Sequence, residues 1–342
     1  MTTEVLSDVL KTVRLTGAVF FEVDASSPWV AEAPPSAELA HLVLPGAQHV
    51  IEYHVIVEGS CWIGRVEADQ VVDLEQVGPG SIVMFPHGDR HVMSSAPNMR
   101  TPPAFGIFHP DDRSARPPYV LKPGEGGDGG AKLICGFLGC DRAPFNPLIE
   151  ALPRTLRIRG CLSGESGWLR GLIEAILTES KARRPGSEGV LARLSELLFI
   201  EVVRLYAESQ PPAASGWLPA LADPCVGRAL RLIHGDPARP WSLHTLAREV
   251  GVSRSVLAER FTASLGAPPM TYLQNWRMQI AEGLLLGGAT KIARIAETVG
   301  YESEAAFSRA FKRCTGVSPA GRRSGMRREG ATAGPPAATA ET

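Results

Sequence analysis

The sequence predicts an α+β chain of several domains. We expect a small β-barrel or sandwich over residues 1–122, a helical connector over 131–210 and an all-helical domain over 224–328. Three observations predict this order: short apolar runs broken by Gly, Pro and Asp, then apolar positions at helical spacing, then a near-repeat with a glycine turn in each copy. A chain of 342 residues with 44% hydrophobic residues has room for two or three buried cores.

The first third reads mainly as β-strand. A short helix is expected to open the chain, beginning near Ser7 or Asp8. The short apolar runs after it favour a small antiparallel barrel or sandwich, and they lie at residues 17–23, 40–44, 49–57, 61–66, 70–74 and 81–85. The glycine-rich segment 123–130 predicts a flexible loop.

The middle of the chain has the spacing of amphipathic helices. Residues 168–183 and 190–209 each carry Leu, Ile or Val on one face, and Pro185-Gly186 separates them, which predicts a helical hairpin. Two interpretations stay open, because the hairpin can form a homodimer seam or pack on the barrel. Residues 210–215 form an expected linker, and the small and polar tail at 329–342 predicts disorder.

The near-repeat lies in the last hundred residues. Leu246-Ala-x-x-Val250-Gly251 and Ile295-Ala-x-x-Val299-Gly300 are each followed by further apolar positions and by a second turn, Gly266-Ala-Pro-Pro269 in one and Gly316-Val-Ser-Pro319 in the other. Helical spacing interrupted by a glycine and then resumed is typical of a helix-turn-helix. Two copies about fifty residues apart suggest two reading helices for DNA.

The second helix of each copy is the predicted reading helix. Ser253 is expected to cap the first, over 254–265, and the other spans 303–314. We predict that their outward residues contact DNA: Arg254, Ser255, Ala258, Glu259, Glu304, Ala305, Ser308, Arg309, Lys312 and Arg313. Arg309 is the main candidate for a base contact, whereas Lys312, Arg313, Arg322 and Arg323 are expected to neutralise phosphates.

The charge distribution supports this interpretation. Residues 224–328 contain 16 basic and 7 acidic residues, whereas the rest of the chain contains 19 basic and 29 acidic residues. The formal net charge of −1 therefore hides a basic C-terminal module on an acidic body. Such a module is the electrostatic footprint of a phosphate-binding domain.

These residues carry a resemblance to a known family. Residues 240–323 resemble the DNA-binding domain of AraC-type regulators, most specifically in the segment Gly-Tyr-Glu-Ser-Glu-Ala-Ala-Phe-Ser-Arg-Ala-Phe-Lys-Arg that ends at Arg313. The resemblance implies two helix-turn-helix units joined by a helix at 272–286. The two units would contact neighbouring stretches of the major groove. Glu259 departs from the basic or amide residues common at its position.

Four residues of the N-terminal domain form a candidate metal site: Glu52, His54, Glu58 and His91. Alternation along a strand predicts that residues 52, 54 and 58 share one face, with a later strand bringing His91 beside them. Imidazole and carboxylate ligands suit Zn²⁺, Fe²⁺, Mn²⁺ or Ni²⁺. The pattern is similar to the two-part motif of cupin barrels, with Glu52 in place of the usual first histidine. In the alternative, no cofactor is required and the same residues hydrogen-bond a ligand or each other.

The six cysteines show no paired CxxC spacing. With no export signal and no apolar stretch of membrane-spanning length, we expect a cytoplasmic protein with reduced thiols and no membrane partner. Cys61, Cys135 and Cys140 are candidates for sensing oxidants, and the alternative is that they are small core hydrophobes. Segments around residues 8–10, 54–62, 133–137 and 147–153 resemble the cupin-bearing branch of AraC-type regulators, which extends the resemblance over nearly the whole chain.

The resemblance implies a sequence-specific DNA-binding transcriptional regulator that a small effector, a metal or an oxidant controls through the barrel. Its expected partners are double-stranded operator DNA, the effector, a second copy of the chain and, for an activator, RNA polymerase. The rival interpretation is a metal-dependent cupin enzyme with a helical regulatory module. A third is a nonspecific DNA binder, from which a specific factor differs by preferring its operator about 10³-fold or more.

Overall fold

The computed structural model describes most of the chain, namely residues 4–17, 20–103, 105–108, 118–160, 167–211, 215–288 and 290–332. The chain forms two compact units. The barrel unit contains residues 14–142 and 149–212, and the helical unit contains residues 1–13, 143–148 and 213–342. No helix among the described residues is long and apolar enough to cross a membrane.

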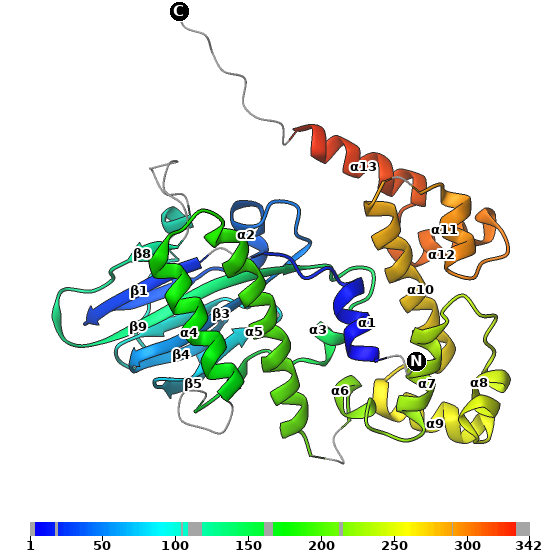
Figure 1. The fold of residues 1–342 in the computed structure, drawn as a ribbon, viewed down its shortest axis with the longest axis horizontal. Coiled ribbons are helices and arrows are strands. Elements are labelled where there is room, and N and C mark those ends of the chain that lie inside the picture. Colours follow the sequence, from blue (N-terminus) through cyan, green and yellow to red (C-terminus); the bar gives the residue numbers. More distant parts are fainter. Residues whose placement is uncertain are drawn as a thin grey trace, which may run out of the picture. The chain divides into compact units, whose positions relative to one another are not determined.

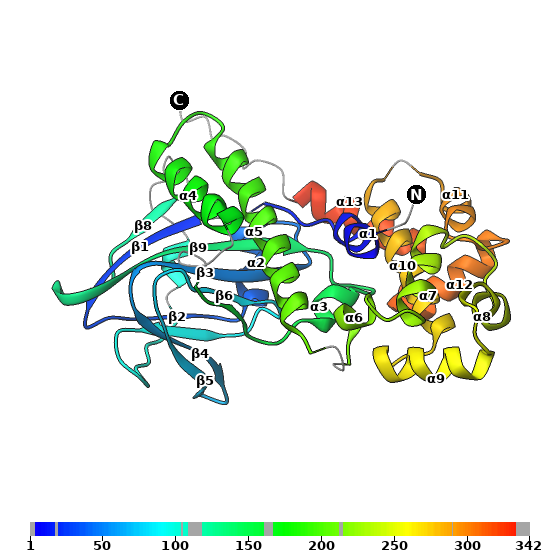
Figure 2. The same ribbon diagram turned by 60° about the horizontal axis from the view of Figure 1, so that its bottom comes forward.

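Two β-sheets form the body of the barrel unit (Figures 1 and 2). The larger sheet has six strands in the order β10 (Leu156–Ile158), β6 (Ile82–Phe85), β3 (His49–Gly59), β9 (Gly127–Cys140), β1 (Phe20–Ser27) and β8 (Tyr119–Leu121). The smaller sheet has the order β2 (Val30–Ala33), β7 (His91–Ser94), β4 (Cys61–Glu67) and β5 (Gln70–Val77). The inner faces of both sheets contribute to one hydrophobic core, which includes Phe21, Ile63 and Phe137.

Strand β9 corrects the predicted domain boundary. The helical connector was expected to begin at residue 131, and the preceding segment to be a loop, but residues 127–140 form one strand that pairs antiparallel with both β3 and β1. The strand is buried on both faces from Leu133 to Cys140. Its apolar residues therefore run continuously instead of alternating, and such a run does not distinguish a strand from a buried helix.

The predicted helical hairpin is confirmed as α4 (Gly167–Ala182) and α5 (Ser187–Ser209). It covers the outer face of the larger sheet (Figure 1). The hydroxyls of Tyr53 on β3 and Ser195 on α5 are hydrogen-bonded at 2.6 Å, and Ser180 on α4 donates to the Glu22 carboxylate on β1. The hairpin thus packs on the barrel, as one of the two interpretations predicted. A shorter helix, α2 (Ser36–Val43), packs against β3.

The helical unit contains both predicted helix-turn-helix pairs. The first is α8 (Leu243–Val250) with α9 (Arg254–Leu265), and the second is α11 (Ile292–Thr298) with α12 (Glu304–Thr315). Between them runs α10 (Pro269–Leu286), which contacts α9, α11 and α12 (Figure 1). The short α6 (Trp217–Ala220) and the longer α7 (Val226–Gly235) precede this array, and α13 (Pro319–Thr332) follows it.

Local chemistry explains where these helices begin. The Ser253 hydroxyl accepts from the Val256 amide at the start of α9, as predicted, and the Ser303 hydroxyl accepts from the Ala306 amide at the start of α12. Ser242 and Thr245 form a reciprocal capping box at α8. The apolar positions of the near-repeat are buried: Leu246, Leu257, Phe261, Ile295, Phe307 and Phe311. Their burial holds each helix pair together.

Two segments outside the C-terminal region also belong to the helical unit. Helix α1 (Val5–Thr12) contacts α7 and α10, and it begins earlier than expected because the Glu4 carboxylate caps it. Residues 143–148 join the same unit, where the Phe145 amide donates to the Gln279 side-chain carbonyl at 3.0 Å. The predicted N-terminal domain of residues 1–122 thus differs from the barrel unit at both ends.

The two turn glycines give a matched stability test. Gly251 and Gly300 both have positive φ, at 86° and 77°. A methyl group would meet nothing at Gly251, but at Gly300 it would collide with the Ala238 carbonyl. We expect Gly251→Ala to cost about 1–2 kcal/mol for the left-handed conformation alone, and Gly300→Ala to cost clearly more. Urea unfolding of the full chain measures both, and equal losses would show that the Ala238 contact imposes no constraint.

Candidate nucleic-acid interface and barrel cavity

The predicted DNA contacts lie on the outward faces of α9 and α12. Ser255 and Glu259 are exposed and Ala258 is half-buried on α9, while Glu304 and Ala305 are exposed and Ser308 is half-buried on α12. The basic members Arg254, Arg309, Lys312 and Arg313 are all exposed. No salt bridge holds any of these four cations within the described ranges, so their charges are available to a partner.

Two other arginines have different surroundings from those predicted. The Arg322 guanidinium donates to the buried Glu282 carboxylate of α10 at 2.7 Å, and Arg323 donates to the Thr290 carbonyl at 2.5 Å. Both are half-buried. They anchor the start of α13 to the rest of the unit, so the structure does not support the expectation that they neutralise phosphates.

Val256 is an exposed residue of α9 that was not among the predicted DNA contacts. Its side chain is 40% exposed. Its exposure could have been predicted from the helical spacing. Val256 precedes the exposed Glu259 by three residues, which places both side chains on one helix face. An exposed valine on a reading helix suits apolar contact with a thymine methyl group.

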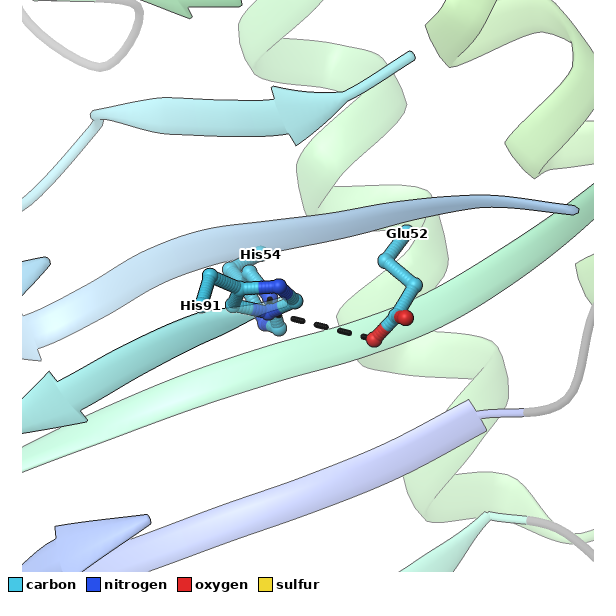
Figure 3. Close-up of side chains that lie close together, drawn as sticks. All are labelled: Glu52, His54 and His91. Atoms are coloured by element: carbon cyan, nitrogen blue, oxygen red, sulfur yellow. Dashed lines mark hydrogen bonds and ion pairs between the residues drawn. The ribbon is translucent and has the colours of Figure 1, made fainter. Parts of the chain in front are cut away.

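A second group of candidate functional residues lies inside the barrel unit (Figure 3). Glu52 and His54 of β3 and His91 of β7 place one ligand atom each within 4.8 Å of one another, and all three side chains are buried. The His54 and His91 Nε2 atoms are 2.8 Å apart, and His91 Nε2 lies 3.8 Å from Glu52 Oε2. The structure therefore brings together three of the four predicted metal ligands.

Glu58 does not join them, and the alternation argument was wrong at this position. The pairing of β3 with β9 shifts register between Ile56 and Glu58, so one extra residue reverses the alternation. The Glu58 side chain is instead 62% exposed and forms an ion pair of 2.7 Å with Lys132. A bulge of this kind gives no reliable signal in the sequence.

The surroundings of the cluster fit a transition metal. His91 Nδ1–H donates to the Asp89 carbonyl at 2.9 Å, which directs the Nε2 lone pair toward His54. The Ser36 hydroxyl donates to Glu52 Oε1 at 2.7 Å. Hydrogen bonds from outer groups to ligand side chains are the usual support of a metal site, and two imidazoles with one carboxylate suit Zn²⁺, Fe²⁺, Mn²⁺ or Ni²⁺.

Burial controls the charge of these three groups. It raises the pKa of Glu52 to about 8, although the Ser36 hydrogen bond opposes the shift. Burial also lowers the pKa of His91 to about 4 and takes the pKa of His54 well below its usual value, with His91 adding to the effect. At neutral pH the cluster is therefore largely uncharged, because a low-dielectric environment disfavours each ionised form.

A cavity of about 340 Å³ lies beside the cluster within the barrel unit. Glu52 and His54 form part of its wall, together with Phe21, Val23, Trp29, Met93, Leu121, Cys135 and Phe137. Cavities of this size with apolar walls and a few polar groups are typical binding sites for small molecules.

The three cysteines proposed as oxidant sensors are buried free thiols. Burial raises the pKa of Cys61 and of Cys140 to about 12 and that of Cys135 further, so the reactive thiolate is disfavoured at all three. Cys135 and Cys140 lie five residues apart on β9, which separates them by roughly 16 Å along an extended strand. They cannot form a disulfide while that strand is intact, because bridged cysteines lie within about 7 Å of each other.

Comparison with known proteins finds a family match for each of the two regions. Residues 4–208 match a cupin family and residues 246–324 match a helix-turn-helix domain family. A protein of Streptomyces lividans described as an AraC-like transcription regulator is 33% identical over 275 residues, which are 80% of this chain and 86% of that protein. The chain belongs to the AraC-like transcription regulators. Like them, it is a DNA-binding transcriptional regulator with a helix-turn-helix domain.

Two further matches cover different shares of the chain. The HTH-type transcriptional regulator AlkR of Acinetobacter baylyi is 28% identical over 318 residues, which are 92% of this chain and 97% of that protein. The crystal structure of a DNA-binding transcriptional dual regulator from Escherichia coli K-12 covers 30% of this chain and 90% of that chain, at 26% identity and a TM-score of 0.28.

Proposed function

We propose that an effector bound in the barrel cavity sets the affinity of this regulator for a specific operator. The observation that carries the proposal is the presence of two built sites in one chain: a largely apolar cavity in the barrel unit, and two capped helices with available cations in the helical unit. By linkage, a ligand that changes operator affinity must have its own affinity changed by operator DNA to the same extent.

We propose different DNA contacts for different residues of the reading helices. Arg309 lies in the first half of α12, where a side chain meets base edges and a guanidinium can bind guanine through two hydrogen bonds. Lys312 and Arg313 lie in the last turn and suit the phosphate backbone. Glu259 on α9 disfavours a nearby phosphate, so we expect the first pair to contribute less affinity than the second.

Strand β9 supports a route between the two units. It contributes Cys135 and Phe137 to the cavity wall, and the chain that follows it contains Phe145. The Phe145 ring makes an edge contact with Tyr272 on α10 at a centroid distance of 5.3 Å. Because α10 joins the two helix pairs, a ligand-induced shift of β9 would reach both reading helices.

A second connection begins at the same end of β9. Arg14, which follows α1, donates two hydrogen bonds of 2.7 and 2.9 Å to the Asp141 carboxylate. The chains that leave β9 and α1 are therefore tied together by a bidentate pair, which is stronger and more directional than a single contact. We propose that α1 and residues 143–148 respond together when β9 moves.

We propose that the regulator works as a cytoplasmic homodimer. Val190 and Leu197 on α5 and Trp168 on α4 are exposed large apolar side chains. Val190 and Leu197 are seven residues apart, which places them on one helix face, as in a seam between two helices. A dimer would contact two operator half-sites, and as an activator it would also contact RNA polymerase.

We propose that the barrel unit acts as a sensor and not as an enzyme. Relatives that match 80% or more of the chain are described as transcription regulators. The metal-dependent cupin enzyme remains the alternative, and the cluster of Glu52, His54 and His91 is the observation in its favour. Turnover of a small substrate by the metal-loaded chain would establish that alternative.

Operator binding tests the proposed function. Operators selected from random DNA should bind the full chain about 10³-fold more tightly than unrelated DNA. We expect Arg309→Ala to lose about 1–3 kcal/mol of discrimination at one base pair. Lys312→Ala, the matched control, should weaken binding to all sequences alike and reduce the salt dependence. Fluorescence anisotropy with singly substituted operators measures this, and an unchanged preference of Arg309→Ala at every position would refute the base contact.

Hydrogen exchange tests the β9 route. Operator binding to the wild-type chain should change amide exchange in β9, because linkage between the sites is reciprocal. Phe145→Ala should remove that change while operator affinity stays within about threefold, since Phe145 lies on neither reading helix. Val120→Ala, an exposed position on β8, is the control and should retain the response. The same β9 response in Phe145→Ala would exclude this route.

Zinc binding tests the cluster. When bound, a divalent ion would supply a Lewis acid at the cavity wall, with Glu52, His54 and His91 as its protein ligands. We expect the chelator-treated full chain to bind one Zn²⁺ in calorimetry, and Glu58→Gln to match it because Glu58 lies outside the cluster. His54→Ala should lose the site. Equal binding by all three proteins would place the ion elsewhere.

A further inference from the structure

Helix α5 packs on the barrel unit with one of its faces. On that face Leu191, Leu198 and Val202 are buried. The Ser195 hydroxyl on the same side is hydrogen-bonded to Tyr53 of β3 at 2.6 Å. The helix contacts α4, β9 and β10. These contacts determine which side of α5 can meet a further partner.

The opposite face of α5 carries a row of apolar side chains. Val190 is 45% exposed and Leu197 is 42% exposed, while Leu194 and Ile200 beside them are half-buried. At 100° per residue, all of them lie within about 60° of Leu197 around the helix, and the row is roughly 15 Å long. Neighbouring apolar side chains at a surface, rimmed by polar residues, mark an interaction site.

The charged residues beside this row reverse their sign about its middle. Arg193 lies four residues before Leu197, and Glu201 lies four residues after it. The Arg193 side chain is 77% exposed and that of Glu201 is 18% exposed. Each forms an ion pair within its own helix, at 2.8 Å with Glu196 and at 3.6 Å with Arg204. Such surface pairs are weak, so both charges can also serve a second partner.

A second copy of the same helix fits this order when it runs antiparallel. With a two-fold axis at Leu197, residues equally far before and after Leu197 lie at one level of the helix pair. Arg193 is then level with Glu201 of the second copy, and the same pair recurs on the other side of the axis. A parallel pair would instead place Arg193 level with Arg193, and like charges at one level are unfavourable.

We propose that two copies of the chain associate through this face of α5, antiparallel and with Leu197 on the two-fold axis. Leu194 and Ile200 fill the interface on either side of the axis, and Arg193 pairs with Glu201 across it. The interface rests on the homodimer of the proposed function, to which it adds the helix face, the direction and the ion pairs.

Sedimentation equilibrium of the full chain tests the centre of the interface. Leu197→Glu brings two like charges together at the axis, so we expect the dimer dissociation constant to rise at least about tenfold. Val120→Glu, a similarly exposed apolar position on β8, is the matched control and should dimerise like the wild type. Circular dichroism should show the same helix content in all three proteins.

Two results would overturn this interface. One is a folded Leu197→Glu chain that dimerises like the wild type, because the contact would then lie elsewhere. The other is a wild-type chain that stays monomeric throughout the micromolar range.

Exchanging the two charges tests the direction. Arg193→Glu or Glu201→Arg alone puts like charges at one level on both sides of the axis, and each should weaken dimerisation about three- to tenfold. The double variant restores opposite charges between the copies and should recover the wild-type dissociation constant. A parallel pair would leave both single variants unchanged, and that result would refute the antiparallel arrangement.

The double variant also separates contacts between copies from those within one helix. Each substitution reverses an ion pair inside α5, with Glu196 or with Arg204. Losses that arise inside one copy would add in the double variant, whereas losses between copies cancel. Additive losses would therefore also contradict the proposed pairing.

Operator affinity separates this interface from the proposed function. Specific operator binding by a chain that stays monomeric overturns the interface and leaves operator recognition intact. A dimer that depends on Leu197 but shows no operator preference retains the interface and refutes the proposed function.

Discussion

The pairing of β3 with β9 is the interaction on which the rest of the structure depends. In this pairing Glu52 lies opposite Phe137 and His54 lies opposite Cys135, so four residues of the cavity wall come from one ladder. The bulge in the same ladder turns Glu58 out to solvent. The chain that follows β9 continues to Phe145 in the helical unit. This strand pair thus supplies part of the cavity wall and determines which predicted ligands come together in the cluster. The chain that follows it continues into the DNA-reading unit.

Local signals in the sequence were sufficient for the helical unit. The near-repeat of apolar positions predicted both helix pairs, and Ser253 was recognised as a cap, because capping and helical spacing are properties of a few adjacent residues. The outward residues of α9 and α12 followed from the same spacing, and their exposure agrees with that placement, except that Val256 is also exposed. The strand content of the first third was also predictable from its short apolar runs.

Features that depend on distant residues were not predictable in this way. Strand β9 is buried on both faces because the core between the two sheets covers one face and α5 packs on the other, so its sequence lacks the alternation of a half-buried strand. The bulge before Glu58 depends on how β3 meets β9, not on the residues of β3 alone. The ion pair of Arg322 with Glu282 joins residues forty positions apart, and only the packing of α13 on α10 reveals it.

The chemistry of the cavity then follows from the desolvation of the cluster. Burial leaves Glu52, His54 and His91 largely uncharged at neutral pH in the metal-free protein. A divalent ion would require an ionised Glu52 and would occupy the Nε2 lone pairs of both histidines. His54 would then carry its proton on Nδ1. Loading the cluster with a metal would therefore move protons on Glu52 and His54 together.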